Sequence, residues 1–306
     1  MATRRAGKAS TPRLAALAIL MFALGLGLGV LFTSQSCSRK GRLPGDEEPT
    51  KPAPKPHPPK PAPPRPEPAR PEPPPVKVPE PTGKLPRLAL VIDDLGYAAP
   101  ELVKRLCAQP VPFSVAVLPY QEYTRESADI AHDRGKEVML HLPMEPVGYP
   151  GPGKDPGPEA VLFELKEPEL RARVRKALAE VPWRKGVNNH MGSRITPDRT
   201  RMRWVLEEIK ARHCFFVDSR TEKDSVAFAM AQELAIPTVQ RKVFLDDDKS
   251  YPEMARQWER ALGIARKEGE VLIIGHIYPE TVEALEKLIP AAQGTVTFVR
   301  AGDLVR

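Results

Sequence analysis

The chain has 306 residues, of which 37 are proline and 3 are cysteine, and its formal net charge is +7 at pH 7. So few cysteines exclude a disulfide framework, and no basic stripe interleaved with aromatic residues is present, so nucleic acid is not an expected partner. Outside the N-terminal and proline-rich parts, enough chain remains for one α/β domain with a sizeable core.

A basic N-terminus precedes an uncharged apolar segment. Residues 1–13 carry several Arg and Lys, and residues 14–32 are apolar over a length that just suffices to cross a bilayer as a helix. The preceding positive charge favours a cytoplasmic N-terminus. We therefore expect a signal anchor, which makes the chain a single-pass inner-membrane protein with its C-terminal domain in the periplasm or extracytoplasmic space. A cleaved signal peptide and lipidation of Cys37 are the alternatives.

Residues 33–86 form the next segment, in which proline alternates with Lys, Arg, Glu and Ala. Such a composition cannot bury a core and favours an extended, polyproline-rich spacer of roughly 3.1 Å per residue. We expect this linker to hold the following domain away from the membrane. A disordered linker whose length has no importance is the alternative.

Strand and helix patterns alternate over residues 87–306. The expected strands cover residues 88–92, 113–118, 137–142, 186–189, 214–217, 238–245, 271–274 and 296–299. The expected helices cover residues 99–108, 122–134, 167–180, 197–212, 225–234, 252–268 and 280–288. This alternation predicts a parallel α/β sheet, most economically closed into a barrel. A doubly wound open sheet is the alternative, but no Gly-x-Gly-x-x-Gly turn follows the first strand.

Polar side chains follow several of these strands. In a (β/α) barrel the C-terminal strand ends meet at one face, where active sites lie. The candidate residues at these ends are Asp93, Asp94, His141, Glu145, Asn189, His190, Ser193, Asp218, Arg220, the aspartates 246–248 and His276. We expect Asp247 and Asp248 to be solvated or to begin a helix.

The separation of His141 and Glu145 suits two ligands of one ion, with Asp94 as the third. Carboxylate and imidazole ligands favour a divalent metal, zinc or a similar ion, with an open position for water. Asp93 is then free to take a proton from that water, and His276 is placed to protonate a leaving group.

A further group of strand-end side chains is expected to bind substrate. Its members are Asn189, His190, Ser193, Asp218 and Arg220. Asn189, His190 and the amides around Gly192 could line the pocket or polarise a carbonyl group. His190 as a metal ligand is the alternative, and the sequence does not choose between the two roles.

The domain resembles the divergent polysaccharide deacetylases, a branch of the NodB-like carbohydrate deacetylases. The matching segments are residues 91–96, 117–120, 141–146, 186–193, 218–220 and 275–279. The resemblance implies a distorted (β/α) barrel and divalent-metal-dependent hydrolysis of N-acetyl groups on a polysaccharide. It also implies that Asp93 is the base, Asp94 a metal ligand and His276 the acid.

The sequence departs from the ordinary members of that superfamily at two places. Leu95 separates the Asp pair from Gly96, and Glu145 stands where those members carry a second histidine. A carboxylate in place of an imidazole should lower the Lewis acidity of the ion and could change which metal binds.

We therefore predict a membrane-tethered, metal-dependent deacetylase acting on a cell-envelope polysaccharide. A barrel that has lost turnover and serves as a glycan-binding or envelope-assembly module is the main alternative. An Mg²⁺-dependent phosphoryl-transfer barrel is a third hypothesis, but the chain lacks a phosphate-cradling glycine loop.

Overall fold

The structure, a computed structural model, describes residues 84–306. The expectations for the basic N-terminus, the apolar segment 14–32 and nearly all of the linker lie outside the described residues. Within residues 84–306 there is no helix whose length and apolar character would let it cross a bilayer.

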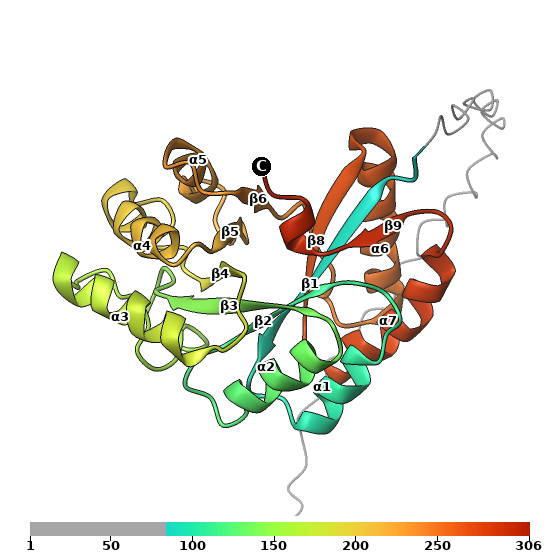
Figure 1. Ribbon diagram of the computed structural model, residues 1–306, viewed down its shortest axis with the longest axis horizontal. Coiled ribbons are helices and arrows are strands. Elements are labelled where there is room, and N and C mark those ends of the chain that lie inside the picture. The colour runs from blue at the N-terminus through green and yellow to red at the C-terminus, as the bar shows by residue number, and fades with distance from the viewer. Residues whose placement is uncertain (1–83) are drawn as a thin grey trace, which may run out of the picture. The chain divides into compact units, whose positions relative to one another are not determined.

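Strands and helices alternate along the described chain, as expected (Figure 1). The strands are β1 (Arg87–Leu95), β2 (Ser114–Val117), β3 (Glu137–Met144), β4 (Gly186–Met191), β5 (Phe215–Asp218), β6 (Thr238–Gln240), β7 (Val243–Phe244), β8 (Glu270–His276) and β9 (Thr297–Val299). The helices are α1 (Pro100–Cys107), α2 (Thr124–Asp133), α3 (Glu167–Glu180), α4 (Arg199–Ala211), α5 (Ala227–Glu233), α6 (Tyr251–Glu268) and α7 (Pro279–Ala292), followed by the 3₁₀ turn η1 (Ala301–Asp303).

Local chemistry sets several helix ends. Proline stands in the first turn of α1, α3, α6 and α7, where its missing N–H costs no hydrogen bond. The N-terminus of α4 is capped by Asp198, whose side chain accepts a hydrogen bond from the Arg201 N–H. Helix α6 ends at Gly269, which has a φ of 83° that glycine adopts without strain.

The strands form one sheet in the order β6-β5-β4-β3-β2-β1-β8-β7, and β9 also pairs with β1. All pairings between these strands are parallel. The two ends of this order, β6 and β7, are consecutive in the chain and are separated only by Arg241 and Lys242. Three Cα–Cα steps span at most about 11 Å, so the sheet curls until its edges approach. A curled parallel sheet excludes the open doubly wound alternative and is consistent with the expected distorted barrel.

The expected strand over residues 238–245 is divided in two, which corrects the sequence prediction. Its first part, β6, pairs with β5, and its second part, β7, pairs with β8. The extended pattern was recognised, but only tertiary pairing shows that one segment serves both edges of the sheet.

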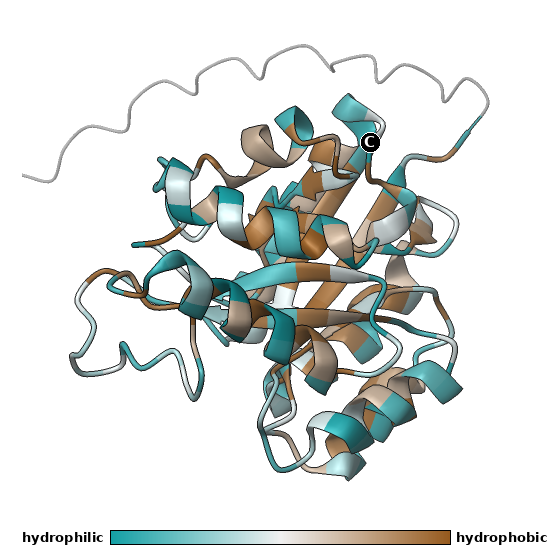
Figure 2. Cartoon of the chain, turned by 60° about the vertical axis from the view of Figure 1, so that its left-hand side comes forward, coloured by the Kyte–Doolittle hydropathy of each residue, from teal (hydrophilic) through white to brown (hydrophobic). Residues whose placement is uncertain are grey.

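Side-chain alternation along β1 divides the core into two parts. Leu88, Leu90 and Ile92 pack outward in the large cluster that includes the helices, whereas Ala89 and Val91 belong to a smaller cluster inside the curled sheet. Figure 2 shows hydrophobic segments concentrated in the strands. The inward series on β1 continues with the next alternate residue, Asp93, so the sheet itself delivers this carboxylate to the C-terminal mouth.

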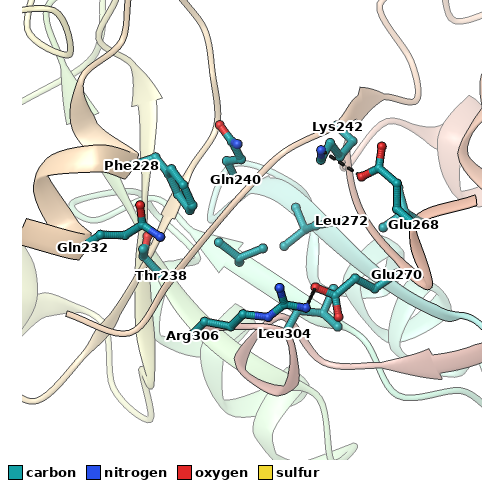
Figure 3. Close-up of a pocket in the computed structure, with 12 residues that line it drawn as sticks. Phe228, Gln232, Thr238, Gln240, Lys242, Glu268, Glu270, Leu272, Leu304 and Arg306 are labelled. Carbon is teal, nitrogen blue, oxygen red and sulfur yellow. Dashed lines mark hydrogen bonds and ion pairs between the residues drawn. The ribbon is translucent and has the colours of Figure 1, made fainter. Parts of the chain in front are cut away.

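A cavity of about 250 Å³ is lined by residues of β6 and β8 (Figure 3). It is lined partly by apolar side chains such as Val271 and Leu272, and ion pairs of Lys242 with Glu268 and of Arg306 with Glu270 lie at its border. Its β8 residues, such as Val271 and Leu272, lie in the N-terminal half of that strand, whereas His276, the register partner of Asp93, lies at the other end. Its acidic groups are both engaged in ion pairs, so it is not the candidate site.

Candidate metal centre

A bulge in β1 brings both Asp93 and Asp94 to the mouth of the sheet. In a regular strand, adjacent side chains point to opposite faces. Here the register between β1 and β2 shifts between Ile92 and Leu95, and Asp94 has a φ of 65°. A left-handed conformation is uncommon for a residue other than glycine, and such outliers gather at functional sites. Leu95, the residue that interrupts the usual motif, pairs with Val117 and is fully buried.

Three ligand atoms from three strands converge at this mouth. Asp94 Oδ1 lies 3.2 Å from His141 Nε2 and 3.1 Å from His190 Nδ1. The two histidine nitrogens are 3.0 Å apart. Among residues 84–306, Asp94, His141 and His190 are the group of His, Cys, Asp and Glu side chains whose geometry could hold a metal ion. His190 therefore lies with the predicted ligands, which is one of the two roles that the sequence left open.

Glu145 does not join this group, which corrects the prediction that it is a metal ligand together with His141 and Asp94. Strand β3 continues through Met144, so Glu145 is about 13 Å along the strand direction from His141. One Glu145 carboxylate oxygen pairs with the Arg194 guanidinium, and the other accepts a hydrogen bond from the Phe163 N–H at 2.6 Å. Arg194 also lies over the Phe163 ring, 4.5 Å from its centroid. Glu145 thus anchors the loop after β3.

Asn188 lies beneath the ligand cluster and is completely buried. Its Oδ1 is 2.8 Å from His141 Nδ1, and its Nδ2 donates to Asp93 Oδ1 at 2.9 Å and to Ser219 Oγ at 3.2 Å. We did not predict a role for Asn188 from the sequence. Alternation along β4 could have found it, because Asn188 and His190 occupy the same face of that strand.

The buried charges perturb one another. Burial raises the pKa of Asp93. Burial would also raise the pKa of Asp94, but the imidazoles of His141 and His190 lower it. For His141, burial is outweighed by Asp93 and Asp94, and its pKa is raised. Burial lowers the pKa of His190, which favours the neutral imidazole that a metal requires.

His276 lies on β8, the strand next to the one that carries the Asp pair. Residues His276 and Asp93 are register partners on β8 and β1. Asp246 accepts hydrogen bonds from the His276 ring Nδ1 and backbone N–H, and a third from Thr281 Oγ1 at 2.7 Å. Burial would lower the pKa of His276, but the hydrogen bond and charge of Asp246, with the charges of Asp93 and Asp94, raise it to about 9. Asp246 belongs to the aspartate run 246–248 that follows a predicted strand, but no role was predicted for it from the sequence.

Asn189 was predicted to bind substrate, but its polar atoms are used within the protein. Its side chain is almost fully buried. It accepts a hydrogen bond from the Ser219 N–H at 2.9 Å and donates to the Met191 carbonyl at 2.9 Å and to Thr221 Oγ1 at 3.3 Å. Asn189 therefore ties the ends of β4 and β5 together.

Ser193, Asp218 and Arg220 likewise organise loops. Ser193 Oγ accepts from the Val147 N–H at 2.9 Å. Asp218 is fully buried and accepts from the Arg220 N–H and from Ser225 Oγ, each at 2.8 Å. The Arg220 guanidinium donates to carbonyl groups of its own loop. The structure places these residues around the mouth without bringing them into the Asp94–His141–His190 cluster.

The cluster fits a divalent cation. Asp94 Oδ1 is buried and has no hydrogen-bond partner among the described residues, although two imidazole nitrogens lie beside it. In a tetrahedral zinc site with metal–ligand distances near 2.1 Å, ligand atoms are about 3.4 Å apart. The observed separations of 3.0–3.2 Å are close to that value. Carboxylate and two imidazoles are an established donor set for zinc and similar ions.

Similarity to known proteins gives independent evidence of the family to which the chain belongs. The family model "Divergent polysaccharide deacetylase" matches residues 90–305. The chain is 36% identical over 220 residues to the uncharacterized Escherichia coli K12 protein YibQ, covering 72% of this chain and 67% of that protein. It is 34% identical over 227 residues to an uncharacterized Haemophilus influenzae protein, covering 72% of this chain and 77% of that one.

A crystal structure of an uncharacterized protein from Agrobacterium tumefaciens C58 shares the fold. The superposition has a TM-score of 0.65 at 24% sequence identity. It covers 73% of this chain and 89% of the other. The fold of the described residues is therefore shared with a protein whose structure has been solved.

Proposed function

Because the chain belongs to the divergent polysaccharide deacetylase family, we propose that it is a metal-dependent hydrolase that removes N-acetyl groups from a cell-envelope polysaccharide. The observation that carries the proposal is the convergence of Asp94, His141 and His190 beside Asp93, with His276 facing them from β8. Family membership supports a polysaccharide as substrate, and the donor set supports a divalent metal.

The chain's own residues divide the chemical work. Asp94, His141 and His190 would hold the metal. When bound, a divalent ion would lower the pKa of a water molecule and polarise the acetyl carbonyl group. Asp93 accepts the proton of the attacking water, and burial, which raises its pKa, makes it a better base near neutral pH.

His276 serves as the acid. Its Nδ1 is occupied by Asp246, so its Nε2 is the atom that donates a proton to the leaving amide nitrogen. With a pKa raised to about 9, the imidazole is protonated at neutral pH and ready for that step. Asp246 orients the ring and stabilises its positive charge, as the carboxylate of a catalytic triad does.

An acetate-release assay tests this function. The full-length chain, loaded with zinc, is incubated with N-acetylated glycans, and free acetate is measured. We expect release by the parent chain and a loss of about a hundredfold or more for Asp93→Asn with zinc content unchanged. Zinc binding without acetate release on any glycan would instead favour the alternative of a glycan-binding module.

We also propose that an N-terminal membrane anchor and a proline-rich linker hold this domain at the extracytoplasmic side of the inner membrane. The uncharged apolar segment 14–32 and the preceding basic residues support the proposal. A reporter that is active only outside the cytoplasm, fused after Arg306, should be active. Deletion of residues 14–32 should abolish its signal, and a persistent signal would contradict the anchor.

A further inference from the structure

Asn188 is the one side chain that hydrogen-bonds both a predicted metal ligand and the predicted base among the described residues. It lies on β4 and is fully buried, so none of its polar atoms can turn to solvent. Its amide oxygen faces His141 Nδ1 at 2.8 Å, and its amide nitrogen faces Asp93 Oδ1 at 2.9 Å. The same nitrogen is 3.2 Å from Ser219 Oγ. The hydrogen bonds of this side chain are therefore all made within the site.

The chemistry of these partners allows one orientation of the amide. An ionised carboxylate only accepts hydrogen bonds, so the NH₂ group of Asn188 must face Asp93. The carbonyl oxygen must then face His141, and an oxygen acceptor requires a proton on Nδ1. His141 Nε2 is consequently left with a free lone pair, and it is this atom that lies 3.2 Å from Asp94 Oδ1.

The same contacts assign separate tasks to the two oxygens of Asp93. Oδ1 is held by the Asn188 amide. Oδ2 lies on the side of the ligand cluster, 3.6 Å from His141 Nε2. The oxygen that faces the place of the cation is thus the one that can take a proton from water, while the other fixes the direction of the carboxylate.

We propose that Asn188 is a positioning residue for the hydrolysis, which fixes the Nδ1–H tautomer of His141 for metal binding and, through its other end, the orientation of Asp93. This inference rests on the proposed function only for the role of Asp93. The part of the inference that concerns His141 is about metal affinity, and it holds whether or not the protein hydrolyses a glycan. One buried amide thereby links the geometry of the ligand to that of the base.

Two substitutions that change the size of the Asn188 side chain little distinguish its contact with His141 from its contact with Asp93. Asn188→Leu removes both contacts, so we expect zinc affinity about 10–100-fold weaker and loss of acetate release. Asn188→Asp retains an acceptor for His141 Nδ1 but loses the donor to Asp93 and places a second carboxylate beside it. We expect Asn188→Asp to bind zinc at least as tightly as the parent chain and to lose acetate release.

The matched control is Asn189→Leu. Asn189 is the next residue of β4 and is equally buried, but its bonds go to Ser219, Met191 and Thr221 rather than to His141 or Asp93. Its substitution should leave zinc affinity within about threefold of the parent, after its folding has been checked by thermal unfolding. A general disturbance of β4 would weaken zinc binding in both leucine variants.

Zinc affinity is measured on the full-length chain by competition with a chromophoric chelator and without substrate. A folded Asn188→Leu variant with parental zinc affinity would overturn the proposal, as would an Asn188→Asp variant that binds zinc as weakly as Asn188→Leu. Side-chain ¹⁵N–¹H spectra of the zinc-loaded parent give a test that needs no variant, because a proton on His141 Nε2 would also overturn it. Failure of the parent to release acetate would count against the proposed function and leave the zinc and tautomer results interpretable.

Discussion

The Asp246 carboxylate accepts two hydrogen bonds from His276, one from the ring Nδ1 at 2.8 Å and one from the backbone N–H at 2.6 Å. Ring and backbone are held by one buried carboxylate, so the direction of the imidazole toward the mouth of the sheet is fixed. The two residues are separated by α6 in the sequence and meet because β7 pairs with β8.

Asp246→Asn tests the role of that carboxylate. Loss of its charge lowers the pKa of His276, so a smaller share of the imidazole is protonated at neutral pH. We expect acetate release by the parent to decline as the pH rises above about 9, and to decline at lower pH in the variant. Turnover at neutral pH should fall at least about tenfold. Asp247→Asn, at an exposed neighbouring position, is the control. If acetate release by Asp246→Asn declines at the same alkaline pH as in the parent, the assignment is contradicted.

His190 and Glu145 provide a direct contrast between ligand and loop anchor. His190→Ala removes one of the three converging atoms, so zinc affinity should fall by about a hundredfold or more. Glu145→Gln should retain zinc but lower the free energy of unfolding by about 1–3 kcal/mol, because the buried carboxylate loses its charge opposite Arg194. Metal titration and denaturant unfolding measure the two effects. Loss of zinc in Glu145→Gln would restore the original prediction for that residue.

The His276–Asp246 pair should also make stability depend on pH. The folded-state pKa of His276, about 9, is higher than the ordinary histidine value of about 6.5, so the folded protein binds the proton more tightly than the unfolded chain does. The contribution is fully present below about pH 6.5 and is lost as the pH rises through about 9. It amounts to about 3 kcal/mol at most. Denaturant unfolding of the metal-free chain should give a lower free energy of unfolding at about pH 9.5 than at about pH 6, and Asp246→Asn should reduce that difference. An equal difference in the parent and in Asp246→Asn would refute the role of the His276–Asp246 pair.

Gly186 on β4 tests the packing inside the curled sheet. A Cβ at this position would overlap the ring of Phe215. We expect Gly186→Ala to lower the free energy of unfolding by about 1–3 kcal/mol through overpacking, and the additional change Phe215→Leu to recover part of the loss. Gly263→Ala, in α6 with open space around it, is the matched control and should be neutral or slightly stabilising. Equal unfolding free energies for both alanine variants would contradict this packing.

The sequence by itself determined the order and type of the elements. An apolar run such as residues 88–92 reads as a buried parallel strand because it is covered on both faces, and this property is local. The same local reading placed Asp93, Asp94, His141 and His276 at strand ends, and a parallel sheet gathers those ends at one mouth whatever its detailed register.

Only the tertiary structure decided which of these side chains meet. Whether residues 238–245 form one strand or two depends on partners elsewhere in the chain, and so does the contact of Asp246 with His276. The spacing of His141 and Glu145 suggested a ligand pair, but β3 extends far enough to carry Glu145 away, and His190 from the adjacent strand takes its place. Ligand geometry is set by sheet register and by the bulge at Asp94, and these are properties of strand pairing that no short motif contains.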